Sequence, residues 1–151
     1  MNVLNRLQQE GVEFKISRHP KTYTAQELAA AEHVPGANVA KPVLVRADGE
    51  YVLCVLPASK RLNPSAVADA LCVGQVELAD EATMVDVFPD CELGAEPPIG
   101  TFFGLDTLVD YSLMADDYIV FQAGSHTESV RMAWDDFERL AEPSYGAISN
   151  P

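Results

Sequence analysis

The chain has 151 residues, enough for one domain whose core needs neither disulfides nor a metal to hold it together. Its formal net charge of −13 argues against a broad nucleic-acid-binding surface, because phosphate binding normally relies on clustered Lys and Arg. Cys54, Cys72 and Cys91 are odd in number and widely spaced, so they predict neither a disulfide framework nor a zinc site. The three histidines also lack metal-ligand spacing, and we expect no metal and no cofactor.

The charge is divided unevenly along the chain. Residues 1–62 hold eight of the ten basic residues against six acidic ones, a balance of +2. Residues 63–151 hold two basic and seventeen acidic residues, a balance of −15. The mildly basic first part is suited to a short piece of phosphate backbone. The simpler interpretation is a solvated acidic surface that keeps the protein dissolved.

No repeat, low-complexity tract or polar linker divides the sequence, so we expect residues 1–151 to form a single domain. Residues 1–10 are too polar for a signal peptide, and no apolar stretch is long enough to cross a membrane. We therefore expect a cytosolic protein without a membrane partner.

The first elements are predicted to be a helix, a strand and a second helix. Residues 2–10 place three apolar side chains at helical spacing before a glycine that can end the helix. Residues 12–16 alternate apolar and polar side chains, which is typical of a half-buried strand. Thr24 and Glu27 fit a capping box, so the second helix is expected to run from there to about His33.

A β-hairpin is predicted next. Two apolar runs, residues 39–47 and 50–57, are joined by Asp48-Gly49, a pair that accommodates the positive φ angles of a tight turn. Lys41 lies inside the first run. Because burial of an unpaired ammonium group is costly, Lys41 requires an explanation. The simple one is that its long stem carries the charge to an exposed face.

Helices and strands alternate through the rest of the chain. Asn63-Pro64 has the form of an N-cap followed by proline at the first helical position, which predicts a helix to Leu71. The further elements expected are a strand at 75–79, a helix at 81–88 capped by Asp80, strands at 105–110, 118–123 and 128–132, and a helix at 134–141. Residues 143–151 are expected to be a frayed tail. The pattern favours an α+β fold with helices over a mixed, mainly antiparallel, barrel-like sheet.

A loop rich in glycine and proline follows the predicted helix at 81–88. Its sequence is Gly94-Ala95-Glu96-Pro97-Pro98-Ile99-Gly100. Prolines stiffen such a loop, and glycine lets a ligand come close to the main chain. Its N–H groups are therefore candidates to face a carbonyl or phosphate oxygen. The alternative is a rigid connection between two elements.

Ser125 and His126 raise the question of a hydrolase triad. Neighbouring residues in extended backbone point to opposite faces, so these two are not expected to act as nucleophile and base. The sequence also lacks a Gly-x-Ser-x-Gly elbow, a Walker loop and a dinucleotide-binding glycine motif.

Taken together, five segments resemble the YbaK/prolyl-tRNA-synthetase-associated editing domain family. They are Thr22-Tyr23-Thr24-Ala25-Gln26-Glu27, Ala40-Lys41, Val55-Leu56-Pro57-Ala58-Ser59, Gly94 to Gly100, and Ala123-Gly124-Ser125-His126-Thr127. The resemblance implies the compact α+β fold of this family, with a mixed sheet. It also implies a freestanding aminoacyl-tRNA deacylase, which hydrolyses an amino acid wrongly ester-linked to a tRNA.

The resemblance also implies a role for individual residues. Lys41 would hold the phosphate or ribose of the terminal adenosine, and the loop from Gly94 to Pro98 would place and polarise the ester carbonyl while water attacks. These make Lys41 and Gly94 the expected catalytic residues. The expected substrate-binding residues are His19, Thr22, Tyr23, Pro98, Gly124, Ser125 and His126. The expected partners are the acceptor end of a tRNA mischarged with a small amino acid, and an aminoacyl-tRNA synthetase.

Pro42 departs from the family pattern, which usually has a small polar residue such as threonine after the lysine. Proline removes a ladder donor, so the site is expected to be reshaped at that edge. Two other functions stay open. One is a module that binds an aminoacyl-tRNA end or a synthetase without hydrolysis. The other is an enzyme that forms a Schiff base through Lys41, which would need a lysine of depressed pKa in a closed pocket.

Overall fold

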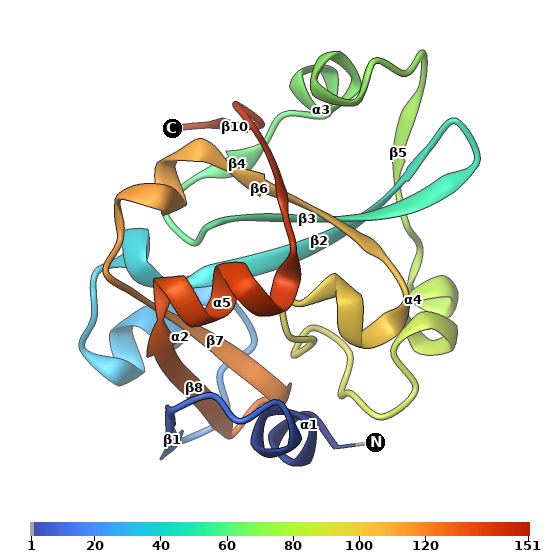
Figure 1. Ribbon diagram of the computed structural model, residues 1–151. Coiled ribbons are helices and arrows are strands. Elements are labelled where there is room, and N and C mark those ends of the chain that lie inside the picture. Colours follow the sequence, from blue (N-terminus) through green and yellow to red (C-terminus); the bar gives the residue numbers. More distant parts are fainter. Residues whose placement is uncertain (1) are drawn as a thin grey trace.

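The computed structural model describes residues 2–151 and has the mixed α+β architecture that the sequence predicts (Figure 1). Its helices are α1 (Val3–Gln9), α2 (Ala25–Glu32), α3 (Pro64–Leu71), α4 (Glu81–Val87) and α5 (Trp134–Ala141), with 3-10 turns η1 (Gly36–Asn38), η2 (Gly100–Phe103) and η3 (Tyr111–Ala115). Its strands are β1 (Phe14–Arg18), β2 (Ala40–Ala47), β3 (Glu50–Pro57), β4 (Arg61–Leu62), β5 (Val76–Leu78), β6 (Asp106–Asp110), β7 (Tyr118–Ser125), β8 (Glu128–Ala133), β9 (Ser144–Gly146) and β10 (Ser149–Asn150).

The larger sheet is built on the predicted hairpin. Its strand order is β5-β2-β3-β6-β9, with β2 antiparallel to both β3 and β5, whereas β6 runs parallel to both β3 and β9. In this register Lys41 on β2 lies opposite Leu56 on β3. The mixed, mainly antiparallel pairing is confirmed.

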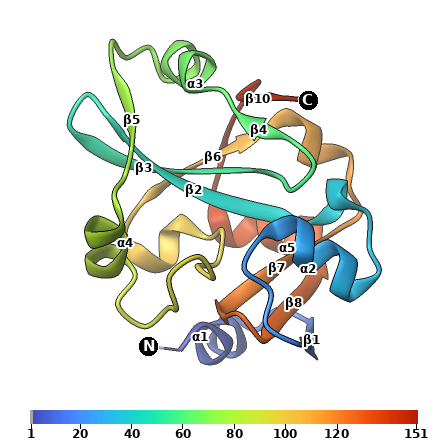
Figure 2. The ribbon, with the colours of Figure 1, turned by 180° about the vertical axis from the view of Figure 1, so that it is seen from behind.

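The second sheet has the order β1-β8-β7 and is antiparallel throughout. A bridge between Val39 and Val120 joins it to the start of β2, and β4 and β10 form a separate antiparallel pair. The strands of residues 2–151 therefore lie in sheets linked by this bridge, and the barrel-like arrangement that we expected does not close. α1 and β10 lie at opposite ends of the molecule (Figures 1 and 2).

Several local signals act as the sequence predicts. Asp48 and Gly49 take φ angles of 46° and 91° in the hairpin turn. The Asn63 side chain accepts from the N–H of Ala66, and the Asp80 side chain caps α4 in the same way. The capping box is only half formed, because the Glu27 carboxylate accepts from the N–H of Tyr23 and not from that of Thr24.

Two predictions are wrong. The strand alternation fails at Ile16, which lies on β1, the edge strand of a three-stranded sheet, and is 44% exposed, whereas Phe14 on the same face is partly buried. The tail is not frayed: β9 pairs with β6 and β10 with β4. Between them Ile148 is fully buried, and its N–H donates to Asp110 at 3.0 Å.

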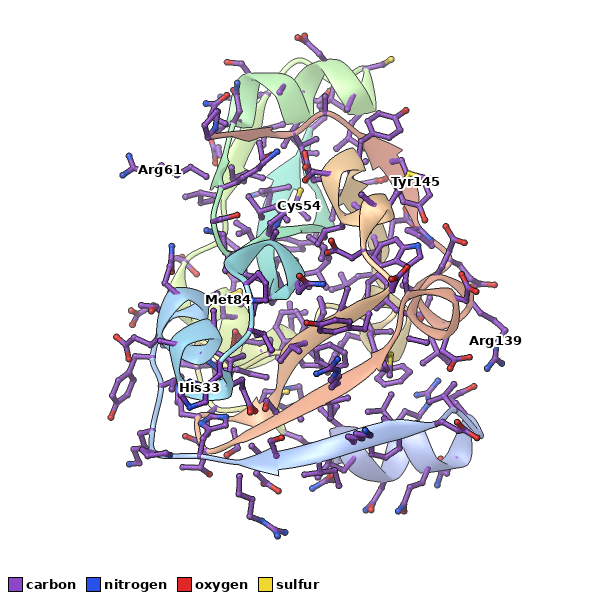
Figure 3. All side chains as sticks on the ribbon, turned by 90° about the vertical axis from the view of Figure 1, so that its left-hand side faces the viewer. His33, Cys54, Arg61, Met84, Arg139 and Tyr145 are labelled. Atoms are coloured by element: carbon purple, nitrogen blue, oxygen red, sulfur yellow. The ribbon has the colours of Figure 1, made fainter. Side chains whose placement is uncertain are left out.

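The main core lies between α1, α5 and the β1-β8-β7 sheet, and a second cluster packs α3 against the larger sheet. Cys54 is buried in this second cluster, as expected for a small core residue (Figure 3). None of the helices in residues 2–151 is long and apolar enough to cross a membrane.

Candidate active site

A pocket of about 110 Å³ lies where α2, β2, β7 and the loop after α4 meet. In Figure 2, α2 lies across β7 beside the start of β2. The pocket is lined by Ala25, Leu28, Val39, Ala40, Lys41, Pro42, Gly94, Glu96 and Gln122. The two residues expected to be catalytic, Lys41 and Gly94, therefore share one small cavity.

Lys41 is half-buried in the wall of this pocket. Burial lowers the pKa of its ammonium group, and the nearby positive charge of Arg61 lowers that pKa further. Within residues 2–151, Lys41 makes no side-chain hydrogen bond or ion pair. Arg61 extends into solvent from β4 (Figure 3). The charged residue that affects Lys41 is thus a second cation, Arg61, and not an acid.

The Gly94 to Pro98 loop is tied down by its own hydrogen bonds. The Gly94 N–H donates to both oxygens of the Glu96 carboxylate, at 3.1 and 3.0 Å, and the Ala95 N–H donates to the carbonyl of Glu92. The Glu96 N–H faces its own carboxylate, and the two prolines have no N–H. Between residues 94 and 98, no N–H group is left free to polarise an ester carbonyl in this conformation.

Glu96 is the buried acid of the pocket, with 4% of its surface exposed. Burial raises the pKa of its carboxyl group above the ordinary value. The N–H groups of Gly94 and Glu96 itself, together with the nearby His126, offset only part of this rise. A role for Glu96 could not be predicted from the sequence, because nothing local indicates that it is buried.

His126 contacts the backbone of two segments beside the pocket. Its Nδ1 lies 2.7 Å from the carbonyl oxygen of Thr22, and its Nε2 lies 2.7 Å from that of Leu93. A neutral imidazole has one N–H and satisfies one carbonyl, whereas the doubly protonated ring donates to both. Tyr23, which is 62% exposed, places its ring 5.0 Å from the imidazole. His126 therefore fixes the backbone on two sides of the site.

Gln122 on β7 is a pocket residue that was not predicted from the sequence. Its Nε2 donates to the carbonyl and hydroxyl oxygens of Thr22, both at 3.3 Å. Its Oε1 is buried and has no hydrogen-bond partner within the described residues. Residues 119–123 are all buried, so no alternation of buried and exposed positions marks Gln122 as a pocket residue.

The other residues expected to bind substrate lie around the pocket and do not line it. The His19 and Thr22 N–H groups bond to the turn after β7. Gly124 has φ 90° and hydrogen-bonds to Ala95 and Glu92, so it holds the loop in place. The Ser125 hydroxyl pairs with Thr127 and not with the adjacent histidine, so the geometry contains no triad. Pro98, the last residue of the loop, is buried and does not line the pocket.

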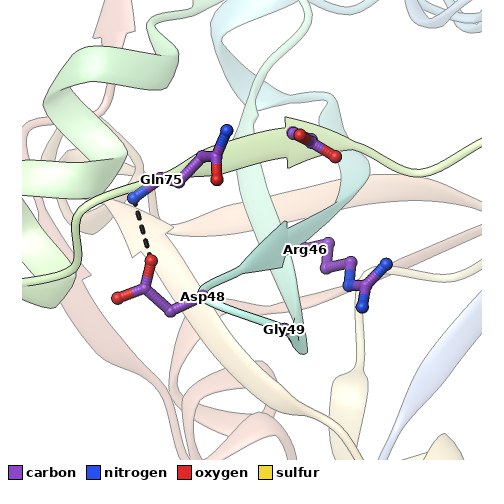
Figure 4. Close-up of a pocket in the computed structure, with 5 residues that line it drawn as sticks. Arg46, Asp48, Gly49 and Gln75 are labelled. Carbon is purple, nitrogen blue, oxygen red and sulfur yellow. Dashed lines mark hydrogen bonds between the residues drawn. The ribbon is translucent and has the colours of Figure 1, made fainter.

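A larger hollow of about 300 Å³ lies at the far end of the hairpin (Figure 4). It is lined by Arg46, Asp48, Gly49, Gln75 and Glu77. Asp48 is already engaged there, since its carboxylate accepts the N–H groups of Gly74 and Gln75. Its charged group serves to hold β5 beside the hairpin, and we do not place the active site there.

Comparison with known proteins identifies the family of this chain. The aminoacyl-tRNA editing domain family matches residues 19–140. The "Multifunctional Ser/Thr-tRNA deacylase ProXp-y" of Escherichia coli (strain K12) is 28% identical over 142 residues, covering 91% of this chain and 84% of that protein. A proline–tRNA ligase of Leuconostoc citreum is 28% identical over 130 residues, which is 84% of this chain and 22% of the ligase.

The fold is shared with solved structures as well. A protein described as a candidate trans-editing enzyme for prolyl tRNA synthetase superposes with a TM-score of 0.88 over 99% of this chain and 95% of its own, at 18% identity. The family model and the shared fold together define an aminoacyl-tRNA editing domain. The chain belongs to the aminoacyl-tRNA editing domain family, which confirms the resemblance. The enzyme class that we expected, a hydrolase of the aminoacyl-tRNA ester, is confirmed at the level of this family.

Proposed function

We propose that this protein is a trans-editing deacylase that removes a small amino acid from a mischarged tRNA in the cytoplasm. The observation that carries the proposal is Lys41, a half-buried pocket lysine that forms no ion pair with any carboxylate of residues 2–151. A phosphate of the terminal nucleotide would supply the missing anion. This would explain why an apolar strand keeps a charged residue that burial disfavours.

The size of the pocket supports a small amino acid. Its volume is about 110 Å³, and its apolar lining comes from Ala25, Leu28, Val39, Ala40 and Pro42. A close-packed apolar wall discriminates by volume, because a larger side chain has nowhere to go. Pro42 contributes to this wall, so we expect it to influence which amino acid is accepted.

Water is the nucleophile in this proposal. The Ser125 hydroxyl is hydrogen-bonded to that of Thr127. Cys54 and Cys91 are poor nucleophiles, because burial raises the pKa of both thiols to about 12. The loop from Gly94 to Pro98 would position the ester by its shape, and Gly94 N–H would polarise the carbonyl only after leaving Glu96.

The test is deacylation of a panel of tRNAs carrying alanine, serine, threonine, cysteine and a large residue such as phenylalanine. We expect hydrolysis of at least one small-amino-acid ester and none of the phenylalanyl ester. Binding of the acceptor end without hydrolysis of any ester would favour the binding-only module instead.

A Schiff-base enzyme is the second candidate, because the lowered pKa of Lys41 is what such a lysine needs. Borohydride treatment in the presence of a small aldehyde or ketone tests it. Under the deacylase proposal Lys41 acts as a charge, so no covalent adduct forms at its Nζ.

A further inference from the structure

We infer that Glu96, with the Oε1 of Gln122 as a second acceptor, binds the α-ammonium group of the aminoacyl ester. The pocket would then select esters that carry a free amino group. This inference rests on the proposed deacylase function and adds a second charged recognition point to it.

Glu96 is a buried acid without an ion-pair partner among the described residues. It is buried, it lines the pocket, and no ion pair joins it to a Lys, Arg or His within residues 2–151. The donors it receives are main-chain N–H groups of the loop. A carboxylate offers about four lone-pair sites on two oxygens, so it has acceptor capacity for an ammonium group. A buried carboxylate left in this state costs stability unless a ligand compensates it.

Gln122 supplies an independent observation at the same cavity. Its amide is oriented by two bonds from Nε2 to Thr22, which leaves Oε1 as a fixed acceptor without a donor. Glu96 and Gln122 both line the pocket, from the loop and from β7. An ammonium group has three N–H donors and no acceptor, which suits a carboxylate and an amide oxygen together.

The charges of the pocket match those of an aminoacyl-tRNA end. Lys41 and Glu96 are the two ionisable side chains that line the pocket, and no ion pair joins them. Neither group neutralises the other. The substrate carries a phosphate on one side of the ester and an ammonium group on the other. A molecule of this kind satisfies both pocket charges at once.

The competing role for Glu96 is a general base that takes a proton from the attacking water. The two roles differ in what they require of the substrate. A general base is needed for any ester in the pocket, whereas an ammonium-binding carboxylate matters only for an ester with a charged amino group.

The experiment compares the ester that the wild type hydrolyses fastest with its α-hydroxy analogue, prepared by deaminating the same aminoacyl-tRNA with nitrous acid. The variants are Glu96→Gln and Glu92→Gln, assayed at about pH 7, where an α-amino group is mostly protonated. Glutamine retains an oxygen to accept the Gly94 N–H, so Glu96→Gln removes the charge and keeps the loop bond. Glu92 is an exposed carboxylate of the same segment and serves as the matched control.

We expect the wild type and Glu92→Gln to prefer the amino ester in kcat/KM by roughly 10- to 100-fold, the range for a hydrogen bond to a charged group. Glu96→Gln should lose this preference by slowing on the amino ester alone. An equal loss on both esters would overturn the inference and indicate a general base or a displaced loop. Equal wild-type rates on both esters would overturn it too.

A binding assay tests the ammonium site independently of hydrolysis. If the wild type hydrolyses no ester, binding of 3′-alanylamino-3′-deoxyadenosine is compared with that of its lactyl counterpart, neither of which has an ester to cleave. Tighter binding of the alanyl compound, abolished in Glu96→Gln, supports the ammonium site without catalysis. Equal binding of the two compounds contradicts it.

Discussion

Gly94 and His126 are in such close contact that a Cβ atom on Gly94 would meet the Cε1 of His126 at 3.3 Å. The imidazole is held there by the carbonyls of Thr22 and Leu93, both at 2.7 Å, so it has little room to give way. The backbone at Gly94 has φ 89°, a conformation that favours glycine. Contact and conformation together fix glycine at this position.

Gly94→Ala should therefore damage the site as well as the fold. The left-handed backbone costs any L-residue about 1–2 kcal/mol, and the new methyl group must push the loop away from His126. A loop displaced by about 1 Å lowers kcat by up to about 100-fold. Deacylation rates and thermal unfolding of the purified variant measure the two effects.

Gly49→Ala is the control for this prediction. Gly49 has φ 91°, and a Cβ there would meet nothing within 4 Å. Its φ angle is close to that of Gly94, but Gly49 lies at the tip of the hairpin. Gly49→Ala should lose similar stability and keep its activity. Equal activity in both alanine variants would mean that the contact with His126 does not position the loop.

Glu96→Gln should raise the stability of the protein at neutral pH. Burial raises the pKa of Glu96, so the folded protein holds a proton there more readily than the unfolded chain does. The ionised carboxylate therefore destabilises the fold as pH rises through the raised pKa. A gain of about 1 kcal/mol would raise the Tm by roughly 2–4 °C in a chain of this size.

The pH dependence of this gain checks its cause. In acid both states of the wild type are protonated at Glu96, and the difference in Tm between wild type and Glu96→Gln should disappear. Glu92→Gln, at an exposed position, should leave the Tm unchanged at every pH. A gain in Tm that persists unchanged in acid would show that the charge of Glu96 is not its source.

Ile148→Ala should destabilise the protein by about 2–5 kcal/mol, the usual cost of emptying a buried aliphatic site. Ile148 is fully buried against Val67 and Leu108, among others, between two strands of the carboxyl-terminal segment. Urea denaturation measures the loss. Ala147→Ser, at the exposed neighbour, should change stability by less than about 0.5 kcal/mol. A loss below 1 kcal/mol in Ile148→Ala would indicate a tail that is only weakly attached.

Local chemistry made much of this fold predictable. The Asp48-Gly49 turn, the Asn63 cap and the amphipathic helix at 134–141 each depend on residues within one turn or hairpin, and all three appear where the sequence places them. Residues 143–151 could not be predicted in this way. Their order comes from pairing with β4 and β6, far away in the sequence, and from the buried Ile148.

The residues of the candidate site also differ in whether local sequence could predict them. Lys41 and Gly94 could be singled out because a cation in an apolar strand and a glycine in a proline-rich loop are each unusual in their own surroundings. Glu96 and Gln122 could not, since an acid in a loop and an amide in a strand are ordinary until the fold buries them in one cavity. The engagement of Gly94 N–H by Glu96 is likewise a product of loop conformation.

The central claim is that Lys41 acts as the charged anchor of a tRNA end, and the rate of deacylation in Lys41→Ala tests it most directly. Lys15→Ala is the control, because Lys15 is an exposed lysine in a strand outside the pocket. Loss of the charge in the pocket should lower kcat/KM on the preferred small-amino-acid ester by about 100-fold or more. Lys15→Ala should retain the wild-type rate. A Lys41→Ala protein that is folded and hydrolyses the ester as fast as the wild type would contradict the account.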